Sequence, residues 1–363
     1  MNLKQITKRR TFWVIISLIL IILIKIFASN SFLVEKYFTA EFFSAFSHLL
    51  RLVTGWLPFS IGDILYFFAA IWLLYKAIRF FIKLIKNKFR FRIIRKSLLT
   101  IWIIVSVVYI IFNIFWGLNY NRKGITYQLS LDTKNYTADD LKNIQKILIG
   151  KVNISKQALI TTHAGYPKNK ELFLRASKCY QQAGLQYPFM QYKDASVKSS
   201  LFGWWGNYLG FTGYYNPFTG EAQVNTTVPG FVLPYTTCHE IAHQLGYAKE
   251  DEANFAGYLT AISSTDTLFH YSAYLDMFLY ANRELYFVDS VSAKETFKQL
   301  SPGVKSDIKE WRDFLIRHKS FVDVWVTWAY GKYLKANQQP KGMQTYNEVI
   351  GDVIALYKKT GKI

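Results

Sequence analysis

Three long runs of hydrophobic residues dominate the first third of the chain. They cover Thr11–Ala28, roughly Ile61–Ile82 and roughly Ser97–Leu118. Each run has about the 20 residues that an α-helix needs to cross the hydrocarbon core of a bilayer. The second run carries Lys76 and Arg79, so a buried or interfacial helix is the alternative interpretation for it. The pattern predicts three transmembrane helices.

From Asn119 onward the pattern becomes that of a soluble domain. Helical spacing covers 137–153, where Thr137 stands as an N-cap before acidic first-turn residues, and again 170–188. Two short strands are expected at Gly210–Tyr215 and Glu221–Val228, joined by an NPFTG turn. Helical patterns return at Thr236 and continue nearly to the C-terminus.

These patterns predict a mainly α fold in two parts. Residues 1–118 are expected to form a membrane domain, and residues 119–363 an α+β domain with a small sheet or hairpin. The aromatic, glycine-rich stretch Leu201–Phe211 fits three places: the rim of a cleft, the membrane interface or the core.

Charge sets the expected orientation. Residues 1–118 hold 16 of the 44 Lys and Arg residues but only 3 of the 24 Asp and Glu residues. The stretch RFFIKLIKNKFRFRIIRK, from the end of the second run to the start of the third, has eight basic residues and no acid, so it and the basic N-terminus should be cytoplasmic. Three crossings then place residues 119–363 outside the cytoplasm. Because two further spans follow the first run, an uncleaved anchor is favoured over a signal peptide. No nucleic-acid motif accompanies the charge, so membrane lipid is the expected partner.

The residues His239-Glu240-Ile241-Ala242-His243 form an HExxH motif. Positions i and i+4 share one face of a helix, so both imidazoles can bind one metal ion while Glu240 lies beside it. Zinc (Zn2+) would lower the pKa of its bound water toward roughly 7, and Glu240 would act as the general base. The alternative is a core helix whose histidines are satisfied by neighbouring groups.

The flanking residues favour the metal site. Pro234 with Thr236 or Thr237 supplies a helix start, and Gly246 supplies a C-terminal cap that turns the chain. The next segment, KEDEANFAGYL, reads as a second helix that can fold back with a third ligand. Cys238 directly precedes His239 and is poorly placed as a ligand, so a buried thiol is expected; a disulfide with Cys179 is not readable from the sequence.

This arrangement resembles the zincin superfamily of metallopeptidases, and the gluzincins in particular. In gluzincins a glutamate on the helix after HExxH is the third ligand, and an acid or amide four residues later supports a ligating histidine. The resemblance implies that Glu250 binds the metal and that Asn254 is its supporting partner. The gap from His243 to Glu250 is shorter than in gluzincins, which leaves Glu252 as the alternative ligand.

The whole chain is also similar to an uncharacterised bacterial family of three-span membrane proteins with an external zincin-like domain. The shared features are PFSIGD before the second span, the three-span layout and HEIAHQLG…EDEANF. This resemblance implies the bacterial inner (cytoplasmic) membrane, with the catalytic domain periplasmic.

Zincins bind an extended peptide along an edge strand beside the active-site helix, so GFTGYYN or EAQVNTTV is the expected binding strand, with a merely covering hairpin as the alternative. A hydroxyl, imidazole or guanidinium usually stabilises the developing oxyanion. The candidates here are Tyr214, Tyr215, His270, Tyr330 and Tyr346, and the family similarity puts Tyr346 first.

The expected function is therefore that of a membrane-anchored zinc metallopeptidase acting on a peptide or protein outside the cytoplasm. Two alternatives stay open: a non-catalytic zinc-binding module used for sensing or interaction, and a zinc hydrolase of a bond other than a peptide bond. An intramembrane protease is disfavoured because the motif lies among polar residues. The sequence does not set the oligomeric state or the cleavage specificity.

Overall fold

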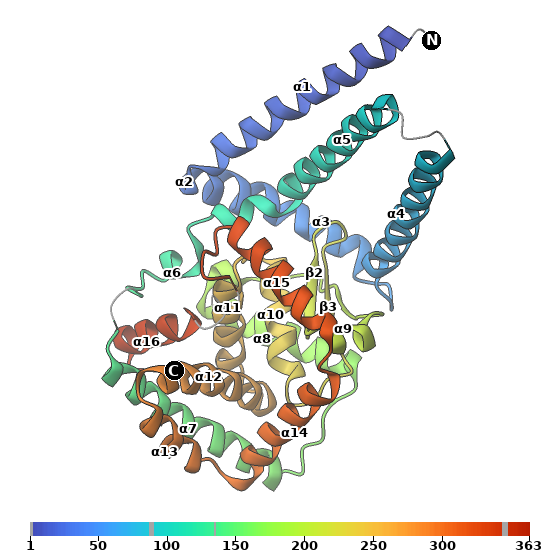
Figure 1. The fold of residues 1–363 in the computed structure, drawn as a ribbon. Helices are drawn as coiled ribbons and strands as arrows, with labels where there is room; N and C mark the ends of the chain where they lie inside the picture. The colour runs from blue at the N-terminus through green and yellow to red at the C-terminus, as the bar shows by residue number, and fades with distance from the viewer. Residues whose placement is uncertain (1–2, 87–90, 134–135, 343–347) are drawn as a thin grey trace.

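The computed structural model describes residues 3–86, 91–133, 136–342 and 348–363. Most of these residues are helical, with one three-stranded sheet, which confirms the predicted fold class. Three long helices project from one side of the rest of the molecule (Figure 1): α1 (Leu3–Ala28), α4 (Ile61–Lys86) and α5 (Phe91–Phe115).

The three long helices contain the three predicted spans. Thr11–Ala28, Ile61–Ile82 and Ser97–Phe115 are each long and apolar enough to cross a membrane. Almost none of their side chains is buried within the protein, so a lipid solvent is needed to cover their apolar surface. The third span ends at Phe115 rather than Leu118, because the chain turns there into the 3-10 helix η2 (Gly117–Asn121).

The connection between the first two spans is helical and packs on the soluble part. It forms α2 (Ser31–Leu33), the π-helix η1 (Val34–Phe43) and α3 (Ser44–Thr54). Val34, Phe38 and Phe43 of η1 share a buried apolar cluster with Tyr215 and Ala248. This connection therefore contacts the segments that carry the HExxH motif and does not lie apart from them.

The sheet combines two expected strands with one that the sequence did not reveal. Strands β2 (Gly213–Asn216) and β3 (Glu221–Val224) form the expected antiparallel hairpin, with Tyr215 opposite Ala222. The additional strand β1 (Val197–Ser199) pairs with β3 in parallel, so the order is β1-β3-β2. Among the described strands, β3 is thus central and β2 lies at an edge.

Helices make up the rest of the soluble part (Figure 1). They are α6 (Gly124–Gln128), α7 (Ala138–Thr161), α8 (Asn169–Gln186), the 3-10 helix η3 (Pro188–Met190), α9 (Gly203–Leu209), α10 (Leu233–Gln244), α11 (Glu250–Ser263), α12 (Thr267–Val288), α13 (Ser290–Lys298), α14 (Pro302–His318), α15 (Phe321–Ala336) and α16 (Val349–Thr360).

Helices α10, α11 and α12 form the centre of the core. Helix α12 lies along α7, and α10 lies along α11. The α10–α11 approach is close, because a Cβ on Gly257 would lie 3.0 Å from the backbone nitrogen of His239. Thr137 caps α7 as predicted, in a capping box with Asp140.

Candidate metal centre

The HExxH motif lies on the buried helix α10, which begins earlier than the sequence suggested. The helix starts at Leu233, with Pro234 in its first turn, where a missing N–H costs nothing. The prediction of a helix start is confirmed for Pro234 and is wrong for Thr236 and Thr237. Both lie inside the helix, and the Thr237 hydroxyl donates to the carbonyl of Leu233, a bond that an intrahelical threonine can make.

The glycine predicted to end α10 does so in a Schellman motif. Gly246 has φ +83°, its N–H donates to the His243 carbonyl, and the N–H of Tyr247 donates to the Ala242 carbonyl. This turn brings the Tyr247 carbonyl back to the helix, where it lies 2.7 Å from Nδ1 of His243. The glycine turn that ends α10 therefore also orients the imidazole of His243.

His239, His243 and Glu250 converge at one point. Oε2 of Glu250, the first residue of α11, lies 3.2 Å from Nε2 of His239 and 3.7 Å from Nε2 of His243. One ligand atom from each residue lies within 4.8 Å of the others. Ligand atoms bound at about 2.0–2.1 Å in a tetrahedron lie roughly 3.3 Å apart, so the spacing suits a small cation.

Glu252 points into different surroundings. Its carboxylate lies 3.1 Å from the Lys249 ammonium and beside Gly124, where a Cβ would collide with it. Among the described residues, the cluster of potential metal ligands contains Glu250 and not Glu252. Asp251 is partly buried near Glu252, and burial raises the pKa of Asp251 to about 7.

Glu250 and the two imidazoles of the cluster affect one another's pKa values. Burial alone would raise the pKa of Glu250, but hydrogen bonds and charge from His239 and His243 hold that pKa well below its usual range. The Tyr247 carbonyl accepts the Nδ1 proton of His243, so Nε2 is the nitrogen that faces the cluster. Burial would lower the pKa of His243, but the hydrogen bond and charge of Glu250 raise it to about 9, and a metal ion would have to displace the Nε2 proton. Two imidazoles and one carboxylate are a donor set that catalytic zinc sites use, so the residues fit zinc.

Glu240 lies beside the cluster as a buried and unsatisfied carboxylate. Its Oε2 accepts no hydrogen bond from any described residue, and burial raises its pKa to about 7 against the lowering effect of both imidazoles. A Cβ on Gly213 of β2 would collide with this carboxylate, so only glycine lets the strand pass so closely. A carboxylate with a pKa near neutrality can accept a proton at physiological pH.

Tyr330 on α15 is the oxyanion candidate that the structure brings to the cluster. Its hydroxyl donates to Oε1 of Glu250 at 2.6 Å. Tyr214 instead donates to Asp63, and His270 contacts the Ser264 carbonyl. Tyr346, the first choice from the sequence, lies outside the described residues.

Asn254 is buried on α11, and its contacts lie with tyrosines around the cluster. The Tyr235 hydroxyl donates to the Asn254 carbonyl, and the Asn254 side chain hydrogen-bonds with Tyr280 of α12. Its predicted role in supporting a ligating histidine stays a prediction.

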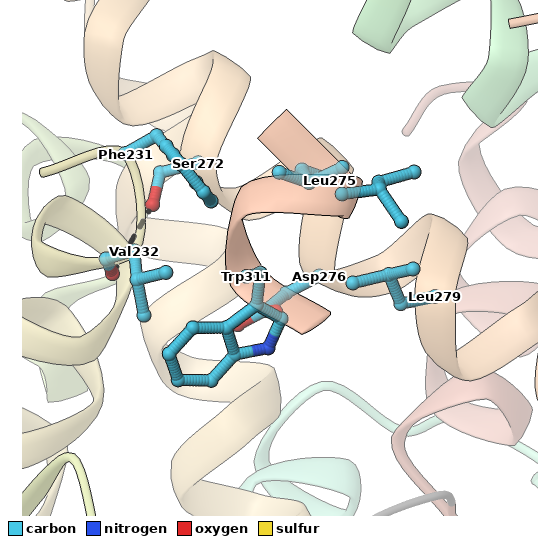
Figure 2. A pocket seen from close by; sticks show the side chains of 8 residues that line it. Phe231, Val232, Ser272, Leu275, Asp276, Leu279 and Trp311 are labelled. Atoms are coloured by element: carbon cyan, nitrogen blue, oxygen red, sulfur yellow. Dashed lines mark hydrogen bonds between the residues drawn. The ribbon is translucent and has the colours of Figure 1, made fainter. Parts of the chain in front are cut away.

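Helix α12 adds an acid that sequence reasoning missed. Asp276 lines a small cavity beside the start of α10, together with Val232 and Trp311 (Figure 2). Burial raises the pKa of Asp276 to about 7, and the charge of His239 acts against that rise. Nδ1 of His239 has no hydrogen-bond partner among the described residues. Asp276 is therefore a candidate for the carboxylate that supports this imidazole. In the sequence, Asp276 is a single acid within a helical pattern, and nothing local marks it as part of a site.

The two cysteines are free and buried, as expected for Cys238. The Tyr180 hydroxyl donates to the Cys238 carbonyl, so this part of α10 is held by packing and hydrogen bonding without a disulfide.

Fold and site together define a mainly helical protein with three helices of membrane-spanning length and a buried His–His–Glu cluster. Residues 38–354 match a family described as Protein of unknown function (DUF3810), and the chain belongs to this family. No curated protein and no solved structure gives a significant match to the chain. The family description assigns no activity, so any function must be argued from the site.

Proposed function

We propose that the protein is a membrane-anchored zinc metallopeptidase that hydrolyses peptide bonds outside the cytoplasm. The observation that carries the proposal is the convergence of His239, His243 and Glu250 beside the unsatisfied carboxylate of Glu240. A helix that only filled the core would not need two imidazoles and a carboxylate aimed at one point next to a fourth, unpaired acid.

His239, His243 and Glu250 would hold the zinc ion. When bound, the ion supplies Lewis acidity that makes water nucleophilic near neutral pH and polarises a carbonyl group. Glu240 would accept the proton of the attacking water and later pass it to the leaving amine, which its pKa of about 7 allows. The Tyr330 hydroxyl, which donates a hydrogen bond to Glu250, would donate to the developing oxyanion.

An extended peptide has a binding strand in β2. Of the two candidate strands, β3 is paired on both sides within the described sheet, whereas β2 lies at an edge next to α10. Strand addition to β2 would pass the peptide backbone near Gly213 and hence near Glu240.

The basic connection between the second and third spans supports a cytoplasmic N-terminus. With three crossings, the metal centre then faces the periplasm of a bacterial inner membrane. Nothing in the charge pattern of residues 119–363 argues for a cytoplasmic site.

Purified full-length protein in detergent or nanodiscs tests the proposal. We expect one zinc per chain by elemental analysis and hydrolysis of internally quenched peptide mixtures. Glu240→Gln should keep the zinc and lose at least 100-fold in hydrolysis, since general-base catalysis contributes about 10²–10⁴-fold. His239→Ala should lose both.

A wild-type protein without zinc after purification under metal-replete conditions would refute the metal site. Zinc binding with no hydrolysis by the wild type would instead favour the non-catalytic module. A Glu240→Gln variant that hydrolyses peptides at the wild-type rate would remove Glu240 as the base.

A further inference from the structure

Helix α15 exposes an apolar face although it is outside the three spans. Phe321, Val324, Trp325 and Trp328 are spaced i, i+3, i+4 and i+7, so they share one side of the helix. Each is at least 60% exposed, and Phe321 reaches 81%. Two tryptophans and a phenylalanine in water on one helix face need a partner that covers them.

The opposite side of α15 faces the protein. Tyr330 follows Phe321 by nine residues, about 2.5 turns at 3.6 residues per turn, so the two point in opposite directions. Tyr330 donates to Glu250, and Leu334 is buried. The helix is therefore held against the metal centre by one face and leaves the aromatic face free.

Contacts with the spanning helices place α15 at the membrane boundary. The hydroxyl of Tyr333 lies 3.0 Å from that of Tyr120, which belongs to η2 directly after α5. Tyr333 also lies near enough to Tyr66 of α4 to interact with it electrostatically. In Figure 1, α15 lies in the half of the soluble part from which the spanning helices leave.

Helix α9 adds tryptophans at the same level. Leu201, just before α9, donates its N–H to Asp63 in the first turn of α4. Trp204 and Trp205 are more than half exposed, so core packing, one of the three alternatives for Leu201–Phe211, does not apply to them. Ser320, at the start of α15, donates to the carbonyl of Tyr208 in α9, which joins the two helices.

We propose that α9 and α15 present an interfacial membrane-binding surface, defined by Trp204, Trp205, Phe321, Val324, Trp325 and Trp328, that lies in the headgroup–acyl boundary of the membrane the protein spans. Tryptophan is enriched at this depth because its ring is apolar and its N–H is polar. Lys332 and Lys335 lie on the same side of α15, and Lys332 lies 5.8 Å from the Trp328 ring. Exposed lysines beside an aromatic face suit anionic headgroups.

This surface would keep the metal centre close to the lipid. The helix that contacts the bilayer is also the helix that places Tyr330 on Glu250. Substrates attached to or lying on the outer membrane surface would then reach the cluster most readily. This last step rests on the proposed peptidase function, whereas the membrane surface itself does not.

A label on the surface tests the inference independently of any activity. Val324→Cys carries the environment-sensitive fluorophore NBD in full-length protein, reconstituted as one copy per nanodisc with anionic lipid. Val291→Cys is the matched control, because Val291 is a 70% exposed valine on α13, away from the spanning helices in Figure 1. The native cysteines are buried, and any labelling of them is measured on the parent protein, which has no added cysteine.

We expect the label at residue 324 to emit at shorter wavelength than the label at residue 291 and to lose intensity with nitroxide lipids. A label at residue 324 that behaves like the control would overturn the inference. A blue-shifted label that lipid nitroxides do not quench would also overturn it, because protein would then cover the face. Trp204→Cys gives a second reading on α9 if the first variant folds poorly.

Discussion

Two acids only two residues apart on α11 have different environments, and this separates their roles. Glu250 faces His239 and His243, whereas Glu252 pairs with Lys249. Residues i and i+2 lie about 200° apart around a helix, so only one of the two can face the cluster. The sequence alone left both open, because their spacing from His243 suited either.

We expect Glu250→Gln to abolish zinc binding and Glu252→Gln to leave one zinc per chain. The neutral amide keeps the size of the side chain but removes the charge that the imidazoles and a cation would share. Elemental analysis of both purified variants measures this directly. Loss of zinc in Glu252→Gln alone, with thermal stability preserved in both, would assign the ligand the other way.

At this scale the motif residues were predictable and their supports were not. His239, Glu240 and His243 follow from helical spacing, which is local. Tyr330 reaches the cluster from α15, and Asp276 of α12 is affected by the charge of His239. No local pattern shows which residues of distant helices will meet. Many tyrosines in the chain offered equally good candidates for the hydroxyl.

At the scale of elements, the turn after α10 connects helix termination to the position of His243 in the His–His–Glu cluster. Gly246 adopts φ +83°, and a Cβ there would lie 3.0 Å from Oδ1 of Asn119 and from the Phe43 ring. The turn determines where the Tyr247 carbonyl meets His243. A change in the turn should therefore alter the orientation of the His243 imidazole.

We expect Gly246→Ala to destabilise the protein by more than the about 1–2 kcal/mol of the left-handed backbone alone, because the added methyl also meets Asn119 and Phe43. Zinc affinity should fall roughly tenfold or more, as for other losses of a group that orients a ligand. Thermal unfolding and competitive zinc titration measure the two effects.

Gly210→Ala is the control for this substitution. Gly210 ends α9 with φ +79° and has nothing within 4 Å of a built Cβ. It should lower stability by the backbone cost and leave zinc affinity unchanged. Equal zinc affinity in both variants would show that the turn does not orient His243.

Elements with a clear local signal were predictable, and elements that depend on distant partners were not. The hairpin was predicted from two short runs around a turn, but β1 has only Val197–Ser199 and exists because it pairs with β3 from outside the local sequence. Helix α10 begins at Leu233 without a side-chain cap, so the threonines that looked like caps were misleading.

At the scale of the whole molecule, the connection between the first two spans supports the metal centre. Glu35 of η1 binds Arg122 in a buried pair at 2.8 Å, and the Arg122 guanidinium lies 4.5 Å from the centre of the Tyr247 ring. Tyr247 in turn holds His243 through its carbonyl. The three spans were predictable from hydropathy, but this chain of contacts was not, since it joins residues far apart in the sequence.

The Glu35–Arg122 pair predicts a pH-dependent stability. Burial alone would raise the pKa of Glu35, but the hydrogen bond and charge of Arg122 lower it below its ordinary value of 4.5. A lowered folded-state pKa gives stability that is complete above about pH 4.5 and is lost as the pH falls through the folded-state pKa. The difference in melting temperature between wild type and Glu35→Gln should therefore narrow in acid.

The measurement uses metal-free protein with chelator, so that pH-dependent metal binding does not contribute. Titration of the His–His–Glu cluster is common to the wild type and the variant and cancels in the difference between them. Glu295→Gln is the control, because the Glu295–Lys298 pair is more than half exposed and such pairs contribute little. A wild-type advantage over Glu35→Gln that stays constant from pH 7 to acid would contradict the assignment.

The orientation of the molecule gives the last prediction. If the basic connection between the second and third spans is cytoplasmic, Asn87 and Val291 lie on opposite sides of the membrane. In spheroplasts, a membrane-impermeant maleimide should label Val291→Cys at once, and Asn87→Cys only after the membrane is permeabilised. The buried native cysteines should stay unlabelled in both.

The reverse order would put the metal centre in the cytoplasm, where the same cluster would meet a different set of substrates. Labelling of both sites in intact spheroplasts would mean that the third apolar helix, Ser97–Phe115, which lies between the two labelled residues, does not cross.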